Sequence, residues 1–352
     1  MRATLLILFL ITTASADDWL FPRGDVQNTG VVKNKGPKKK PSIKWQREEK
    51  GGISTGAALS GGRLVFGVGE FVVACRRASG GAHIWDAKVK QQVVSWPLIR
   101  EEICFFGGQD TVHYRIKMST GGEETSPDAK GAIVAPPTVR DDHYFAGGTD
   151  GTFYAIGSAT GRVLWSHKIG AIEHAAALDK KNVYVATTEG KLFAFNIKKG
   201  TQVWKYESLT PTVAAPIVIK GYVLLPVKHA LIQVNPKSGE VVANHAAKGI
   251  AGAPAVKKTV VHYGTEGGEV VVFDLKSLKE LARIKVGDEK ISAPLILAGK
   301  ALFGVSGTKL FCVDPKARKR IWEYEGPERF QPPIVAGGAV YVGAGNVFYC
   351  LK

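Results

Sequence analysis

Residues of the types that carry out acid–base or nucleophilic chemistry are thinly spread along this 352-residue chain. His174, in the stretch AIEHAAAL, is the histidine that most invites a catalytic role. A catalytic imidazole is oriented by a carboxylate and faces a nucleophile, and no local pair beside His174 guarantees that arrangement. We therefore assign no catalytic residue and interpret His174 as a channel-lining or hydrogen-bonded histidine.

Acidic residues recur at matching places, in the stretches GGQD, GGTDG, TTEG and GTEGG. They could form a cation-attracting rim, but Asp-Gly and Glu-Gly pairs are typical of tight hairpins. None has the D-x-D-x-D-G ligand spacing of a calcium loop. We expect turn residues and no metal site from this set, which comprises Asp110, Asp150, Glu189 and Glu266.

The elements that carry these residues are repeated along the chain. The stretch AIGSATGRVLW, ending at Trp165, is matched by AFNIKKGTQVW, ending at Trp204. Aligned copies end at positions 45, 85, 125, 165, 204, 243, 282 and 322, so each step is 39 or 40 residues. Each period holds four short β-rich runs bounded by Gly, Asp or Asn, which predicts an all-β propeller of four-stranded antiparallel blades.

The two ends of the chain complete one blade between them. The last period stops at NVFYCLK and lacks its final strand, whereas PSIKW, ending at Trp45, is such a strand without a blade. Pairing the two would close the ring and remove exposed sheet edges. We predict an eight-bladed propeller over residues 41–352, closed by the N-terminal strand.

Residues shared by many periods are interpreted as architecture. Large indole rings at one repeat position are expected to fill the gaps between blades rather than to form an aromatic ligand box; these are Trp45, Trp85, Trp165, Trp204 and Trp322. The repeated glycines are expected to take positive φ in a turn; these are Gly161, Gly200 and Gly239.

Three of the cysteines also stand at a position that the repeat defines. Cys75, Cys312 and Cys350 occupy the repeat position of Ala155 and Ala194, where a small residue is needed. Equivalent atoms of neighbouring blades are expected to be too far apart for a disulfide. We predict buried free thiols, with Cys312–Cys350 as the first disulfide to test.

The repeats resemble the PQQ-like β-propeller family, in which A-x-D-x-x-T-G-x-x-x-W recurs once per blade. The stretch DDWLFPRGDVQNTGV is similar to the W-x-x-F-R-G…T-G lead-in of many secreted members. The resemblance implies the propeller fold, but the family includes both quinone-dependent dehydrogenases and non-enzymatic propellers resembling the assembly lipoprotein BamB. An adjacent Cys-Cys pair, a C-x-x-C-H haem motif and long insertions, which the quinone-dependent members carry, are missing here, and this favours the non-enzymatic branch. The lipobox of BamB-type lipoproteins is missing as well, which argues against identity with that protein although the architecture is similar.

Aligning the first strand of each blade places one residue per blade around the axis. This ring is mostly small and neutral, and it comprises Thr55, Ser95, Ala135, His174, Ala214, Gly252, Ser292 and Gln331. If a small ligand binds, we expect it above His174, Gln331 and Trp96.

The first forty residues carry two further signals. The stretch MRATLLILFLITTASADDW has an early arginine, a short apolar run and an A-x-A site, which predicts a signal peptide over residues 1–16 and export to the periplasm or beyond. No later run is long enough to cross a membrane. Residues 17–40 form a lead-in whose lysines, within Lys33–Lys40, contribute to a net charge of +16. They indicate either a solvated linker or attraction to an anionic surface.

Taken together, these features predict an exported, non-catalytic scaffold that binds a protein partner in the envelope or the extracellular space, and not nucleic acid. The alternative is a propeller that binds a quinone, a sugar or a cation in its axial funnel. In that case a quinoprotein-like oxidoreductase with pyrroloquinoline quinone (PQQ) and calcium is expected.

Overall fold

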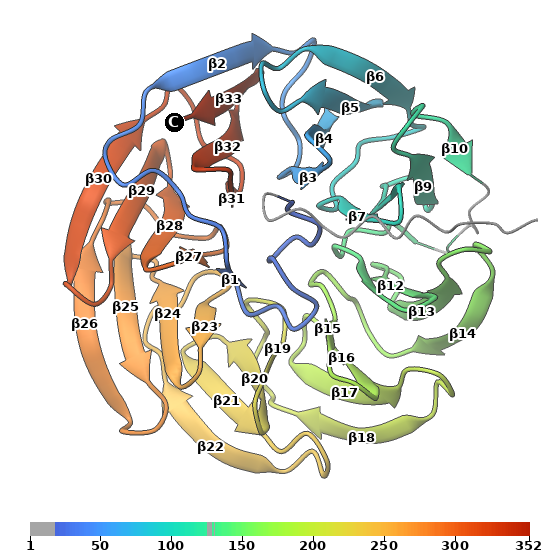
Figure 1. Ribbon diagram of the computed structural model, residues 1–352. Coiled ribbons are helices and arrows are strands. Elements are labelled where there is room, and N and C mark those ends of the chain that lie inside the picture. The colour runs from blue at the N-terminus through green and yellow to red at the C-terminus, as the bar shows by residue number, and fades with distance from the viewer. Residues whose placement is uncertain (1–17, 125–128, 130) are drawn as a thin grey trace, which may run out of the picture.

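A computed structural model describes residues 18–124, 129 and 131–352 of the protein. The predicted signal peptide, residues 1–16, lies outside the described residues. Eight four-stranded antiparallel sheets stand around a common axis (Figure 1), so the predicted eight-bladed propeller is confirmed. In the described part of the chain, every regular element is a β-strand, and no helix of the length and apolar character needed to cross a membrane is found.

In each blade the first strand lies nearest the axis and the fourth lies at the rim (Figure 1). Blades 1 to 4 are β3–β6 (Ala58–Ser60, Arg63–Val68, Val72–Arg77, His83–Lys88), β7–β10 (Leu98–Arg100, Ile103–Gly107, His113–Lys117, Glu123–Glu124), β11–β14 (Thr138–Arg140, His143–Gly147, Thr152–Gly157, Val163–Lys168) and β15–β18 (Ala177–Leu178, Asn182–Ala186, Lys191–Asn196, Gln202–Glu207).

Blades 5 to 8 follow the same plan. They are β19–β22 (Ile217–Ile219, Tyr222–Val227, Ala230–Val234, Val241–Ala246), β23–β26 (Ala255–Lys257, Val260–Gly264, Glu269–Asp274, Lys279–Lys285), β27–β30 (Ile296–Ala298, Ala301–Ser306, Lys309–Asp314, Lys319–Glu325) and β31–β33 (Ile334–Ala336, Ala339–Ala344, Val347–Leu351), completed by β2 (Ile43–Glu48).

Burial explains why the second and third strands read as nearly continuous apolar runs. In β4 every residue after Arg63 is buried, because both faces of this strand pack on neighbouring blades. The rim strand β14 instead alternates exposed and half-buried residues, since one of its faces meets solvent. The core is therefore a set of apolar layers between blades rather than one central cluster.

The ring closes as the sequence predicts. β2 pairs antiparallel with β33, and Trp45 lies opposite Cys350. A short strand, β1 (Val31–Val32), adds in parallel to the inner edge of blade 7.

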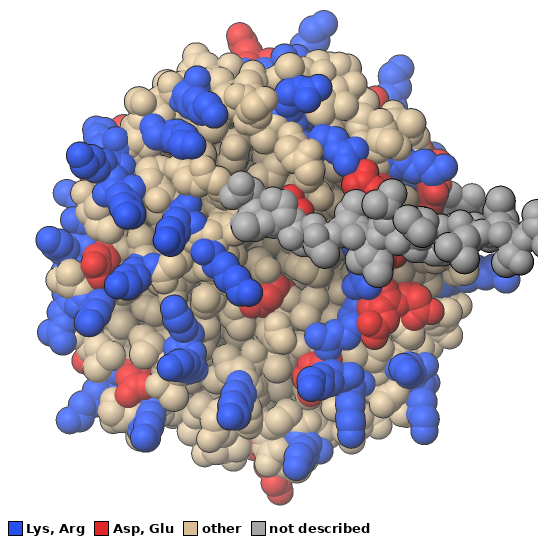
Figure 2. Space-filling model, viewed as in Figure 1, with Lys and Arg blue, Asp and Glu red and all other residues tan. Residues whose placement is uncertain are grey.

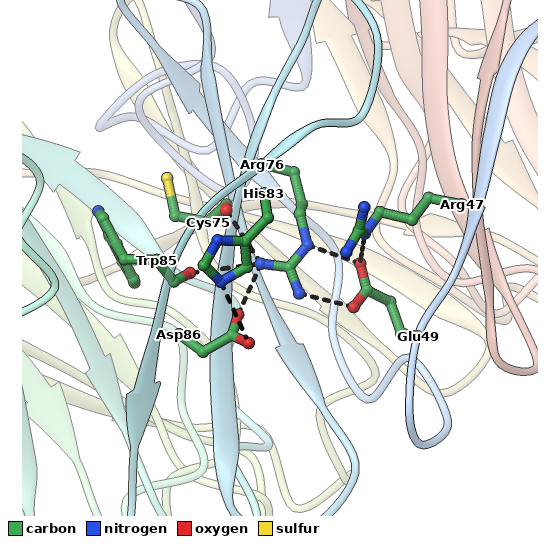
Figure 3. Close-up of polar contacts among 7 residues, drawn as sticks. All are labelled: Arg47, Glu49, Cys75, Arg76, His83, Trp85 and Asp86. Carbon is green, nitrogen blue, oxygen red and sulfur yellow. Dashed lines mark hydrogen bonds and ion pairs between the residues drawn. The ribbon is translucent and has the colours of Figure 1, made fainter.

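Buried charges hold this closing strand against blade 1 (Figure 3). Arg76 on β5 donates two hydrogen bonds, of 2.8 and 2.6 Å, to the carboxylate of Glu49, which follows β2. A third bond of 2.6 Å reaches Asp86 on β6, and Arg47 also pairs with Glu49. Arg76 and Glu49 are only 3% and 6% exposed, so the pair is shielded from water and salt.

The lead-in before β2 winds around the axis, past the inner strands of the blades, rather than away from the body (Figure 1). Its backbone carbonyls accept hydrogen bonds from the innermost strand or turn of blades 1, 2 and 4 to 8. The donors are the amides of Leu59, Ile99, Leu178, Val218, Val256, Leu297 and Gly338. Asn28 donates its side-chain amide to the carbonyls of Ala176 and Pro216 at 3.1 and 3.2 Å. On this face the inner edges of these seven blades are therefore bonded to the protein's own chain.

Candidate functional site

His174 lies just before β15 of blade 4. Its ring is hydrogen-bonded to the backbone of Thr212, and the charges of Glu173 and Arg23 act on it. Burial lowers the pKa of His174 below its usual value, so the ring is neutral near pH 7. These contacts give the imidazole a hydrogen-bond partner within the fold.

The other two residues expected near a ligand are each held by blade 1. The indole of Trp96 donates a 2.6 Å hydrogen bond to the carbonyl of Ala57, and its ring packs on Gly56. The side-chain amide of Gln331 donates to the carbonyl of Ile53 at 3.0 Å. Trp96 leads into blade 2 and Gln331 into blade 8, so His174, Trp96 and Gln331 belong to three different blades.

The repeated tryptophans each reach across to a neighbouring element. Every indole N–H donates to a backbone carbonyl at 2.9 or 3.0 Å. The donor and acceptor pairs are Trp45–Ala78, Trp85–Met118, Trp165–Ile197, Trp204–Pro236 and Trp322–Pro37. In the first four pairs the acceptor belongs to the next blade, so each ring lies in the seam between two blades.

Two other positions make room for each ring. On the same sheet, the residue opposite the tryptophan is always Ala or Cys, as in Ala194 opposite Trp204. Under four of the rings, those of Trp45, Trp85, Trp165 and Trp204, lies a glycine of positive φ from the next blade: a Cβ atom at Gly239 would stand 2.8 Å from Cδ2 of Trp204. Cβ atoms do not approach this closely, so tryptophan, small residue and glycine form one packing unit.

Two seams lack both the tryptophan and the glycine of this unit. Ala243 of blade 5 and Ala282 of blade 6 stand at the repeat position where five other blades have tryptophan and blade 2 has Thr125. They lie opposite the larger Gln233 and Val272. On the next blades the glycine position is taken by Leu278 and Arg318, which keep positive φ values of 58° and 57°. Without a ring to accommodate, these positions accept side chains.

A groove opens at each of these seams. Groove A, of about 1040 Å³, lies against blade 5 and is lined from both sides of its seam with blade 6. Its residues include Val218, Ile219, Lys220, Gln233, Pro236, Val256, Lys258, Leu275 and Lys276. Groove B, of about 710 Å³, lies between blades 6 and 7 and includes Lys257, Lys258, Val272, Leu281, Leu297, Lys300, Pro315, Lys316 and Arg318. The two grooves share Lys258 and Thr259, so they adjoin one another.

Comparison with known proteins identifies the sequence family of this chain. The sequence family described as outer membrane protein assembly factor BamB matches residues 40–124, 101–174 and 169–352. The chain belongs to this family. No curated protein sequence matches the BamB-family chain.

Solved structures agree on the fold of the BamB-family chain. A computationally designed protein, Ika8, is 17% identical with a TM-score of 0.78, covering 88% of this chain and 99% of its own. BamB from Moraxella catarrhalis is 14% identical with a TM-score of 0.73 and coverage of 89% and 97%. The quinohemoprotein alcohol dehydrogenase from Comamonas testosteroni is 11% identical with a TM-score of 0.78 and coverage of 97% and 81%. At these identities the likeness shows the fold alone.

The grooves of the BamB-family chain are strongly cationic. Exposed ammonium and guanidinium groups border them, at Lys220, Lys257, Lys258, Lys276, Lys300, Lys316 and Arg318. The nearest acids are used in turns: Asp179 accepts from two backbone amides and from the Tyr184 hydroxyl, and Asp314 accepts from two backbone amides. In Figure 2, Lys and Arg outnumber Asp and Glu on the side of this face that carries β22, β26 and β30.

The lysine segment Lys33–Lys40 lies on the same face but is no free linker. Gly36 packs on the ring of Phe303, the carbonyl of Lys35 accepts from Gly338, and the carbonyl of Pro37 accepts from Trp322. The lysine side chains of the segment are exposed. The backbone is thus fixed across blades 7 and 8 while the charges remain in solvent.

Cysteines and acids take the structural places that the repeat indicates. All four cysteines are buried free thiols, and Cys75, Cys312 and Cys350 are among the small residues opposite a tryptophan. Asp110 and Asp150 accept backbone amides two residues ahead, as hairpin residues do. Within the described ranges, no three His, Cys, Asp or Glu side chains gather where they could hold a metal ion.

Sequence reasoning did not find the grooves, although a signal for them was present. In the alignment of repeats, the anchor is alanine at 243 and 282, and the matching turns read DLKSL and DPKAR instead of NIKKG or NPKSG. Loss of tryptophan and glycine at the same seam indicates a gap between blades, and the lysines beside it indicate its charge.

Proposed function

We propose that this BamB-family chain is an exported, non-catalytic scaffold that binds protein partners in the cell envelope. The family description, which concerns assembly of outer membrane proteins, supports a role in protein–protein interaction. The observation that carries the proposal is the axial course of the lead-in. A segment bonded to the innermost strand or turn of seven blades surrounds one end of the axis, where a funnel-shaped active site would have to open, and leaves the outer surfaces for binding.

The axial residues do not fit a calcium-held quinone. Calcium is bound by six to eight oxygen ligands, with carboxylates prominent among them. Around this axis the hydroxyl oxygen of Thr55 accepts from the amide of Gly67, and that of Ser95 accepts from Gly107. The buried acid of the lead-in, Asp25, accepts from the amide and hydroxyl of Thr29. These oxygens already accept hydrogen bonds from groups within the fold, so the proposal includes no PQQ and no calcium.

Reconstitution tests the absence of catalysis. The purified mature chain is incubated with PQQ and calcium, dialysed, and examined for quinone absorbance and for alcohol oxidation with an artificial electron acceptor. We expect neither retained absorbance nor turnover. Retained quinone together with turnover would replace the scaffold with an oxidoreductase.

Partner binding and export are tested in cells that make the tagged full-length chain. Cross-linking in the envelope fraction, followed by mass spectrometry, is expected to recover the same partner protein in repeated experiments. N-terminal sequencing of the fractionated protein is expected to show cleavage after Ala16, in agreement with the A-x-A site. An uncleaved chain confined to the cytoplasm would contradict an envelope role.

A further inference from the structure

We infer that grooves A and B form one binding site for an extended segment of a partner protein that carries alternating apolar and acidic side chains. This inference rests on the proposed scaffold function and names the chemistry of its partner. It comes from the two seams that lack both the tryptophan and the glycine of the packing unit.

The floors of both grooves are apolar. Val218, Val256 and Leu275 line groove A, and Val272, Leu281 and Leu297 line groove B. Aliphatic side chains gain free energy by leaving water for such surfaces, at roughly 25 cal/mol per Å² of buried apolar area. A ligand made only of charged or sugar groups would leave these floors unused.

The borders of the grooves are cationic and lack paired acids. In the described part of the chain, no ion pair is found for the six lysines or for Arg318 at the borders, whereas other surface cations, such as Arg283, are paired. Lys258 belongs to both grooves and stands on the ridge between them with a φ of 59°. Carboxylates placed between apolar groups would meet this ridge.

The arrangement favours a peptide in extended form. Side chains of an extended strand point alternately to opposite sides, so apolar groups facing the floor alternate with groups facing the borders. Two adjoining hollows on successive seams offer apolar surface on both sides of the Lys258 ridge. A uniformly charged polymer such as heparin matches the borders but not the floors.

The test uses a fluorescein-labelled peptide of about twelve residues in which Leu and Glu alternate, roughly 40 Å long when extended. Two peptides of equal length serve as controls, one with every Leu replaced by Ser and one with every Glu replaced by Gln. Fluorescence anisotropy with the full mature chain is expected to show binding of the first peptide and at least about tenfold weaker binding of both controls. Equal binding of the Ser peptide, or displacement by heparin at equal charge, would overturn the inference.

Charge variants locate the site. Lys276→Ala with Lys316→Ala removes one cation from each groove, and we expect binding to weaken at least about tenfold. The matched control is Lys198→Ala with Lys199→Ala. Lys198 has the same position in its turn as Lys276 and Lys316 have in theirs, but the seam beside it holds Trp165. Equal weakening by both pairs would show attraction to the whole face and would overturn the assignment to the grooves.

Filling variants test the grooves without relying on charge. Gln233→Ala, Ala243→Trp and Leu278→Gly together give seam 5–6 the packing unit of its neighbours, and Val272→Ala, Ala282→Trp and Arg318→Gly do the same for seam 6–7. Because the unit already occurs in this fold, circular dichroism and melting temperature are expected to show a folded protein of at least unchanged stability. Peptide binding is expected to be lost; unchanged binding by both folded variants would overturn the inference.

The two proposals fail in different ways. Cross-linking that recovers a partner whose contacts lie outside the grooves, with no peptide binding, removes the groove site and keeps the scaffold. Quinone-dependent turnover removes the scaffold function and leaves the peptide measurement to be judged by itself.

Discussion

The indole of Trp322 donates a 3.0 Å hydrogen bond to the carbonyl of Pro37, a residue 285 positions earlier in the chain. At the comparable seams the acceptor comes from the turn before the rim strand of the next blade, as Pro236 does for Trp204. Blade 8 has no such turn, because its rim strand β2 comes from the start of the chain. The lysine-rich segment therefore supplies both the acceptor for Trp322 and the connection that leads into the closing strand.

Replacing Gly239 by alanine tests the packing unit. Its φ of 77° costs an alanine about 1 to 2 kcal/mol, and the new Cβ would collide with Trp204, adding about 1 to 3 kcal/mol. Gly221 is the matched control, since its φ is 89° but a Cβ there meets no atom within 4 Å. Urea unfolding should give a larger loss for Gly239→Ala. Equal losses would mean that backbone strain alone requires the glycine.

The buried pair of Arg76 and Glu49 is expected to be needed for closure (Figure 3). Arg76→Met leaves the Glu49 carboxylate buried without its main partner, which should lower the free energy of unfolding by about 3 to 5 kcal/mol. Adding Glu49→Met should recover part of this loss. Arg283→Met, which breaks exposed pairs with Glu269 and Glu280, should change stability by less than about 1 kcal/mol. If Arg76→Met lowers the free energy of unfolding no more than Arg283→Met does, the buried pair has no role in closing the ring.

Thiol labelling checks the state of the cysteines. Burial raises the pKa of Cys75 and of Cys312 to about 12, so little thiolate exists at pH 8 and reagents cannot reach it. Iodoacetamide should leave the native protein unmodified and should add four groups after unfolding in urea without reductant. Only two additions would reveal a disulfide, and Cys312 with Cys350 would be the first pair to examine. Ser238→Cys, at an exposed turn, serves as a positive control for labelling.

Acid should destabilise the fold partly through buried histidines. Burial lowers the pKa of His262 to about 4, against about 6.5 in the unfolded chain. Because the pKa of His262 is lower in the folded protein than in the unfolded chain, the stability linked to its neutral ring is fully present above pH 6.5. This stability is lost as the pH falls toward 4. Between pH 7 and pH 5 this amounts to about 2 kcal/mol. His262→Gln should reduce the pH dependence of urea unfolding by that amount, and an unchanged slope would contradict a neutral buried imidazole.

The repeat predicted the fold because its signals are local and recur. Each blade needs its own turn and its own apolar strands, so their spacing along the chain counts the blades. The final strand that the last period lacks is found before the first blade, ending at Trp45, and this predicted the closure. The partners within a packing unit could not be predicted in the same way. Trp204 and Gly239 come from successive copies of one pattern, and only the ring geometry shows that they share a seam.

The lead-in and the grooves escaped prediction for a different reason. The backbone carbonyls of Val26, Gln27 and Thr29 accept hydrogen bonds from three different blades, and such bonds depend on position rather than on side-chain type. The grooves arise where a ring is absent at Ala243 and Ala282, and an absence is visible only against the other copies. His174 drew attention as a lone titratable group, but lone groups of this kind say little about where a partner would bind.

Closure of the ring also sets an order of events during synthesis. Strand β2 leaves the ribosome first but pairs only with β33, which is made some three hundred residues later, as the bond from Ser42 to the carbonyl of Lys352 illustrates. Until then the chain is an open arc with unpaired strand edges at both ends, which exposes it to aggregation. The protein is therefore expected to depend on holding factors during translation or export, and to gain resistance to proteases in a single late step.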